Sequence, residues 1–159
     1  MVRLITLYLA GILVMGALVA VGFIRGCSAN SAENKIAEEI ADVSPAYTMT
    51  AGQLYAAFLD DEHGAEVAYT GRVVQISGVI DGLTNAAGTP YVSFEGRGAW
   101  GVKCYLTEEE YAKIDDLDNL RSQRLVMKGR VEKRDLFLNM RGCVLLGRES
   151  LFAPGERQS

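Results

Sequence analysis

The stretch that decides the fold is residues 69–81, Tyr-Thr-Gly-Arg-Val-Val-Gln-Ile-Ser-Gly-Val-Ile-Asp. It is rich in β-branched residues, which favour β-strands, and Gly71 and Gly78 bracket its centre. Its apolar residues fall on both faces of the expected strand: Val74, Ile76 and Ile80 on one, Val73 and Val79 on the other. Such a strand passes from one covered environment to another, and an internal glycine marks the bend. This behaviour is typical of the first strand of a small closed barrel.

Four later segments alternate between apolar and polar residues, and each predicts a strand, at 91–95, 102–106, 125–131 and 136–146. The side chains expected to face the barrel interior are Val102, Cys104 and Leu106, then Leu125, Met127 and Val131, and finally Leu136, Leu138, Met140, Val144 and Leu146. Gly- and Pro-containing segments separate these strands and favour turns.

Two helices are expected around these strands. Thr50 and Gln53 have the spacing of a capping box, which predicts a helix from about 51 to 61 packed on the barrel. Thr107 and Glu110 repeat the pattern and open an amphipathic helix that reaches about residue 120. Three strands, a helix and two strands follow the order of the OB-fold, so we expect an all-β, five-stranded barrel with accessory helices.

At this point the chain also resembles a known family, the bacterial tRNA_anti-like proteins. The resemblance covers about 48–146 and implies a small exported OB-fold domain attached to a membrane. The residues that carry it, in order along the chain, are Leu54-Tyr55, Tyr69-x-Gly71, Ile76-x-Gly78, Pro90-Tyr91-Val92, Val102-x-Cys104-Tyr105, Gly129-x-Val131 and Cys143-Val144.

The N-terminus indicates where the domain resides. Residues 4–24 carry no charge, and about 21 apolar residues are enough to cross a bilayer as a helix. Arg3 precedes the segment and acidic residues soon follow it, so the positive-inside rule favours a domain on the outer side of the membrane. We therefore predict an N-terminal transmembrane signal anchor in the bacterial inner membrane, single-pass, with the domain in the periplasm. Cys27, after a lipobox-like sequence, offers lipidation as the alternative attachment.

The chain accordingly divides into four parts. These are the transmembrane anchor at 1–26, a linker at 27–47, the OB-fold domain at 48–150 and a disordered tail at 151–159. Within the linker, apolar residues at helical spacing favour a partly helical spacer from about residue 31.

Charge and residue content exclude several classes of function. The chain has 16 basic and 20 acidic residues and a net charge of −4, which disfavours general nucleic-acid binding. The single histidine, His63, lies in an acidic helix end, and no Ser/His/Asp or Cys/His set, P-loop or HExxH motif occurs. We expect no enzyme activity, no metal site and no cofactor.

Cys104 and Cys143 lie on the third and fifth predicted strands, which are neighbours in an OB barrel. In an oxidising compartment they would form a disulfide that closes a loop of about 40 residues. The alternative is a pair of buried free thiols that act as small apolar residues.

A ligand-binding face is expected on the second and third strands. Aromatic rings interleaved with cations suit stacking on bases or sugars, whereas the alternative is that the rings fill the barrel ends and the cations solvate strand edges. The candidate residues are Tyr91, Trp100, Lys103, Tyr105, Arg130 and Arg141.

Three functional hypotheses follow. The first is a membrane-tethered, extracytoplasmic, non-catalytic binding module for an envelope protein or a small ligand. The second is a structural or interaction subunit of an envelope complex. The third, a single-stranded nucleic-acid binder, rests on the fold analogy alone and conflicts with the acidic balance.

Overall fold

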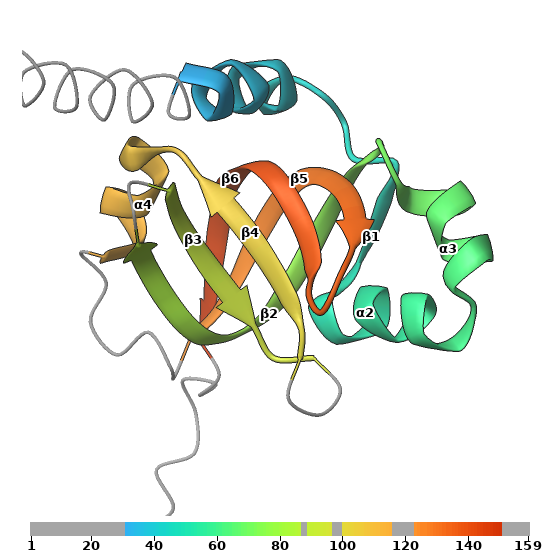
Figure 1. The fold of residues 1–159 in the computed structure, drawn as a ribbon. Coiled ribbons are helices and arrows are strands. Elements are labelled where there is room, and N and C mark those ends of the chain that lie inside the picture. The colour runs from blue at the N-terminus through green and yellow to red at the C-terminus, as the bar shows by residue number, and fades with distance from the viewer. Residues whose placement is uncertain (1–30, 87–88, 97–99, 116–122, 151–159) are drawn as a thin grey trace, which may run out of the picture.

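The computed structural model of the chain describes residues 31–86, 89–96, 100–115 and 123–150. Figure 1 shows a closed barrel with helices packed around it. In chain order the elements are a helix over 31–41, β1 (Tyr47–Thr50), α2 (Ala51–Asp60), α3 (Glu62–Tyr69), β2 (Val73–Ala86), β3 (Thr89–Phe94), β4 (Val102–Leu106), α4 (Glu108–Asp115), β5 (Gln123–Arg134) and β6 (Leu138–Ser150).

Three predictions concern residues outside these ranges. They are the transmembrane segment 4–24, the lipidation site Cys27 and the tail 151–159. Among the described residues, no helix combines the length and the apolar character needed to span a bilayer.

The barrel is organised by β2, as the sequence predicts. Its first half, Val73–Val79, pairs antiparallel with β5, and its second half, Ile80–Ala86, pairs antiparallel with β3. The exchange of partners follows Gly78, where a Cβ atom would lie 2.9 Å from Phe94 Cδ1. The strand begins later than predicted, because Tyr69 still belongs to α3 and Gly71, at φ +78°, turns the chain.

The remaining pairings close the barrel. β3 pairs antiparallel with β4, β4 parallel with β6, and β6 antiparallel with β5, so five strands form a closed ring. β1 adds a sixth strand, parallel to the first half of β2. With α4 between β4 and β5, the architecture is a five-stranded mixed barrel with helices, consistent with the predicted OB-fold.

The predicted inward face of the last strand is wrong beyond its first half. Leu138 and Met140 are buried as expected, but Gly142 has φ +60° and the register with β4 and β5 shifts around it. The extra residue of this β-bulge reverses the parity of the strand. Cys143 therefore points inward, whereas Leu146 is exposed.

Two further expectations about this strand and the helices need correction. Leu136 lies in the turn before β6 and is 62% exposed rather than inward. Residues 60–63, expected to be an exposed acidic helix end, are exposed and do end α2, but they also lead directly into a helix that was not expected, because the Asp61 carboxylate accepts a hydrogen bond from Gly64 N at 3.0 Å and caps α3.

The helix over 31–41 is docked on the barrel, a packing that the linker prediction for 27–47 did not include. Ile40 is completely buried, and Glu33, also buried, accepts a hydrogen bond from Gly142 N at 3.0 Å. At the other end, the Lys128 ammonium donates to the carbonyl oxygens of Ala41 at 2.7 Å and Val43 at 3.2 Å. A cation at a helix C-terminus satisfies free carbonyls and opposes the negative end of the dipole.

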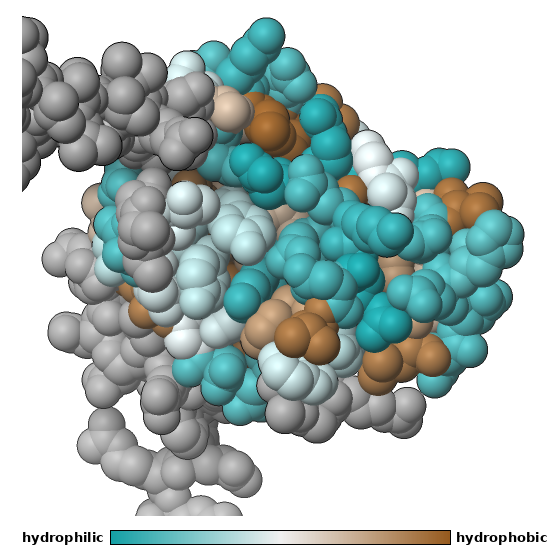
Figure 2. Space-filling view, viewed as in Figure 1, coloured by the Kyte–Doolittle hydropathy of each residue, from teal (hydrophilic) through white to brown (hydrophobic). Residues whose placement is uncertain are grey.

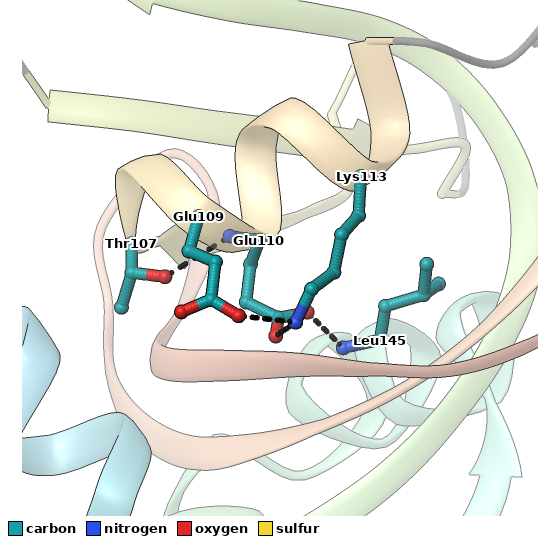
Figure 3. A network of polar contacts seen from close by, with 5 residues as sticks. All are labelled: Thr107, Glu109, Glu110, Lys113 and Leu145. Carbon is teal, nitrogen blue, oxygen red and sulfur yellow. Dashed lines mark hydrogen bonds and ion pairs between the residues drawn. The ribbon is translucent and has the colours of Figure 1, made fainter.

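A carboxylate attaches α4 to β6 (Figure 3). Thr107 Oγ1 accepts from Glu110 N at 3.1 Å, which is the first half of the predicted capping box. The Glu110 side chain does not return to Thr107, however. It accepts from Leu145 N at 2.8 Å and from the Lys113 ammonium at 2.7 Å, so the buried carboxylate joins two elements.

We predict that Gly142→Ala destabilises the protein by about 1–3 kcal/mol, because a side chain at positive φ is strained. The new Cβ would also overlap Ile36 of the docked helix. Urea denaturation measures the loss. Gly147→Ala is the matched control, since that β6 glycine has no atom within 4 Å of a Cβ position. Equal stability of the two variants would contradict the role given to the bulge.

Candidate functional site

The outer side of β3, β4 and β6 carries most of the candidate residues. Tyr91 of β3 is paired with Tyr105 of β4, and Ser93 with Lys103, so alternate side chains of both strands point outward together. The side chains of the opposite parity, including Val92 and Cys104, are buried. The β3–β4 face is turned toward the reader in Figure 1.

Rings and cations touch in one continuous series on this face. The Lys103 ammonium lies 3.8 Å from the ring centre of Phe137 and 5.0 Å from that of Tyr91. Trp100 meets Phe137 edge-on at 5.1 Å between ring centres, and Tyr91 lies 5.8 Å from Tyr105. The Arg141 guanidinium stands 5.7 Å over the Tyr105 ring. We call this series the aromatic row: Trp100, Phe137, Lys103, Tyr91, Tyr105 and Arg141.

The cations around the aromatic row already have partners within the chain. Arg141 forms an ion pair with the buried Glu33 of the docked helix. Arg130 lies opposite Arg141 in the β5–β6 register and pairs with Glu39 at 3.3 Å. The carboxylates of the helix over 31–41 thus compensate the positive charges of the two arginines on the side of the face formed by β5 and β6. The part that presents ring surface is formed by β3, β4 and the turn before β6.

Phe137 is the residue of the row that the sequence analysis missed. The Asp135 carboxylate accepts from Phe137 N at 2.8 Å, and Tyr55 OH donates to Leu136 O at 3.2 Å, so the turn is held on both sides. The hydrogen bond from Phe137 N lowers the pKa of Asp135 below its usual range. One signal was available in the sequence: Phe137 stands between two leucines, on the parity opposite to theirs.

Burial raises the pKa of the Tyr105 phenol, and the charge of Asp135 acts in the same direction, whereas Arg141 opposes it. The phenol is therefore neutral at physiological pH and can donate a hydrogen bond. Together with the flat rings beside it, this gives the face stacking surface and a polar donor, the combination that recognises planar or cyclic groups.

Two concave regions border the face. One, of about 260 Å³, lies at the Trp100 end of the aromatic row, and its described lining includes Gly96, Trp100, Gly101 and Phe137. The other, of about 350 Å³, lies between the helix over 31–41 and the start of α4, and its lining includes Glu38, Glu108 and Glu109.

The two core cysteines are buried free thiols, so the structure does not confirm the predicted disulfide. Cys104 Sγ lies 4.0 Å from Met140 Sδ, and burial raises the pKa of Cys143 well above its usual value, with the Cys104 thiol contributing next. The Cys143 thiol is therefore not available as a thiolate nucleophile at neutral pH.

The structure thus brings five of the six candidate ligand-binding residues into one row. Four belong to strands, and Trp100 joins through Phe137. Arg130 is adjacent but turns toward Glu39. The docked helix that provides Glu39 had no signal in the sequence beyond its helical spacing.

The sequence profile of the tRNA_anti-like family matches residues 1–137. The chain belongs to this family. None of the curated proteins matches the sequence. The resemblance stated from the sequence motifs is thereby confirmed.

Solved structures are similar in fold. A lipoprotein from Klebsiella pneumoniae subsp. pneumoniae, which carries the provisional name of a nucleic acid-binding protein, is 18% identical with a TM-score of 0.51 over 69% of this chain and 97% of that chain. An OBody bound to hen egg-white lysozyme is 20% identical with a TM-score of 0.39 over 54% of this chain and 84% of that chain. At 18% identity the likeness to the lipoprotein concerns the fold alone.

We predict that Asp135 makes folding depend on pH in the acid range. Because the pKa of Asp135 is lower in the folded chain, its ionised form stabilises the fold above the unfolded pKa, and this contribution is lost as the pH falls through the folded pKa. The difference in unfolding free energy between the wild type and Asp135→Asn should therefore shrink between pH 7 and pH 3, as urea titrations would measure. The same comparison with Asp42→Asn, at another exposed carboxylate, is the control; an unchanged difference for Asp135→Asn would contradict the assignment.

Proposed function

We propose that this protein is a membrane-attached, extracytoplasmic binding module that catalyses no reaction and holds its ligand on the aromatic row. The observation that carries the proposal is the continuity of the row, in which ring contacts and cation contacts extend from Trp100 to Arg141. Strands position most of these side chains, and a site on strands is held more rigidly than one on loops.

The engaged cations argue for a ligand that is recognised by its shape and its apolar surface. A polyanion gains affinity by neutralising its charge against free lysines and arginines. Here Arg130 and Arg141 face carboxylates, and Lys103 lies against two rings. The acidic chain adds no excess of positive charge. The nucleic acid in the name of the Klebsiella lipoprotein is therefore the less favoured ligand for this chain.

The surface also bears on the alternative of a structural subunit. A stable protein interface needs an apolar patch of several hundred Å². Figure 2 shows this side of the molecule as mostly hydrophilic, with apolar residues in small separate groups. This supports a ligand contact of limited area on this side over a permanent subunit interface.

Membrane attachment rests on the uncharged segment 4–24 or on Cys27. The name of the Klebsiella protein, a lipoprotein, accords with either arrangement. The helix over 31–41 begins only a few residues after these attachment points. Its docking would therefore hold the barrel close to the bilayer instead of at the end of a free linker.

We predict that a photo-crosslinking amino acid placed at Tyr91 of the full-length protein, in cells, yields one defined adduct. The same amino acid at Val67, which is 68% exposed on α3, is the control and should yield none. Mass spectrometry then identifies the class of ligand without presupposing it. A nucleic-acid adduct, or adducts that form equally at both positions, would contradict the proposal.

We predict that the exported protein forms the Cys104–Cys143 disulfide, because the two buried thiols interact directly and an oxidising compartment favours their pairing. Protein from the envelope fraction, alkylated in denaturant without reductant, should carry label on neither cysteine, and prior reduction should expose both. Two labelled cysteines without reductant would refute the pairing. Peptide mapping separates this pair from Cys27.

A further inference from the structure

Arg141 connects the aromatic row to the docked helix over 31–41. Its guanidinium lies 5.7 Å from the ring centre of Tyr105, at one end of the row. The same guanidinium forms an ion pair with the buried Glu33 of the helix. The position of the helix therefore decides whether the charge of Arg141 is free to act on a ligand of the row.

Two arginines lie directly opposite each other where the helix is docked. Arg130 of β5 and Arg141 of β6 are partners in the antiparallel register. Like charges directly opposite one another destabilise a sheet, so this arrangement requires a negatively charged occupant. In this structure the occupants are carboxylates of the helix, Glu39 at 3.3 Å from Arg130 and Glu33 at Arg141.

The bulge of β6 adds a backbone donor beside the arginines. The Gly142 amide donates to the Glu33 carboxylate at 3.0 Å, next to the guanidinium that pairs with the same group. A guanidinium and an amide that converge on one carboxylate form a receptor for an acidic group. We call Arg130, Arg141 and the Gly142 amide the cationic strip.

The helix is attached to the barrel separately from the barrel core. It lies outside the closed ring of strands (Figure 1). Ala37 and Ile40 are its buried apolar residues, and neither belongs to the cluster of side chains that fills the barrel. The Glu39–Arg130 pair is partly exposed, and such pairs contribute little to stability. An element held by so few buried contacts opens at a lower free energy than the core.

We propose that the docked helix is an autoinhibitory contact. Its carboxylates fill the cationic strip, and its release makes the strip available to an acidic group of the ligand that lies on the aromatic row. The inference deepens the proposed function, on which it rests for the ligand. The ligand class is a cyclic or planar molecule with one acidic group, since two arginines beside a row of rings offer too few cations for a polyanion.

The proposal has a quantitative consequence. An acidic group can bind the strip only in the open form, so its apparent affinity is reduced by the fraction of molecules that are open. As long as the open form is a minor one, a variant that opens tenfold more often must bind the acidic ligand about tenfold more tightly. A neutral ligand that needs only ring surface must bind all variants equally.

Hydrogen exchange measures the opening in full-length protein in detergent micelles. We expect peptides from 31–43 to exchange faster than peptides from β2 and β5, with the barrel still protected. Glu33→Gln keeps the shape of the side chain and removes its charge, which should increase opening about tenfold or more. Glu39→Gln should increase it about two- to fivefold. Glu38→Gln, an equal change of charge at an exposed position of the same helix, is the matched control and should leave opening unchanged.

Two probes that differ by one charge measure the binding. N-acetyl-tyrosine carries a ring and a carboxylate, and N-acetyl-tyrosine amide carries the same ring without the charge. In titrations followed by NMR, Glu33→Gln and Glu39→Gln should bind the carboxylate probe more tightly by the factors found for opening. Glu38→Gln should bind it like the wild type, and the amide should bind all four proteins equally. Arg141→Met should lose the preference for the carboxylate.

Three results would overturn the proposal. The first is a helix that exchanges only together with the barrel, which would make it a permanent part of the fold. The second is a Glu33→Gln variant without any preference for the carboxylate probe over the amide. The third is a Glu38→Gln variant that behaves like Glu39→Gln, because the effect would then follow from the net charge of the helix and not from the strip.

The crosslinking at Tyr91 separates this inference from the proposed function. A defined Tyr91 adduct, together with a helix that opens only with the barrel, would remove the autoinhibitory contact alone. Independent opening and a carboxylate preference without any Tyr91 adduct would remove the ligand-binding role of the row and leave the strip as a site for acidic groups.

Discussion

The exchange of partners along β2 is the constraint on which the rest of the structure depends. A strand that pairs with β5 over its first half and with β3 over its second must coil at the junction, and the barrel closes because it does so. The junction follows Gly78, which packs so closely against Phe94 and Ala51 that a side chain there would displace them. Closure leaves the ring without open strand edges. The buried side chains of β3 and β4 then face the interior, and the alternate, more polar side chains face outward.

Departures from regular strand pairing create the sites on this barrel. The bulge at Gly142 turns Cys143 into the core, and the Gly142 amide donates a hydrogen bond to the carboxylate of Glu33. The bulge at Asp81 places an acid at the rim of the cavity beside Trp100. In both places the extra residue of the bulge interrupts the regular strand pairing. This interruption directs a side chain or a backbone amide to a position that it would not have in a regular strand.

The docked helix determines the electrostatics of the outer face. It supplies carboxylates to two arginines and carbonyl oxygens to Lys128, so three cations of β5 and β6 are compensated within the chain. What stays accessible is ring surface, together with acids at one end. For this chain we therefore propose a ligand recognised by its cyclic or planar surface instead of a polyanion.

The sequence by itself determined the parts of this protein that depend on local pattern. Alternation located β3, β4 and β5, the capping box located the start of α2, and the same alternation placed Tyr91, Lys103 and Tyr105 on one face. Only the tertiary structure decided the parity of β6 beyond Gly142, the place of Phe137 in the row and the docking of the helix over 31–41. Strand alternation and helix capping depend on a few neighbouring residues. A bulge, a ring contact and the docking of a helix depend on which distant segments of the chain pack against each other.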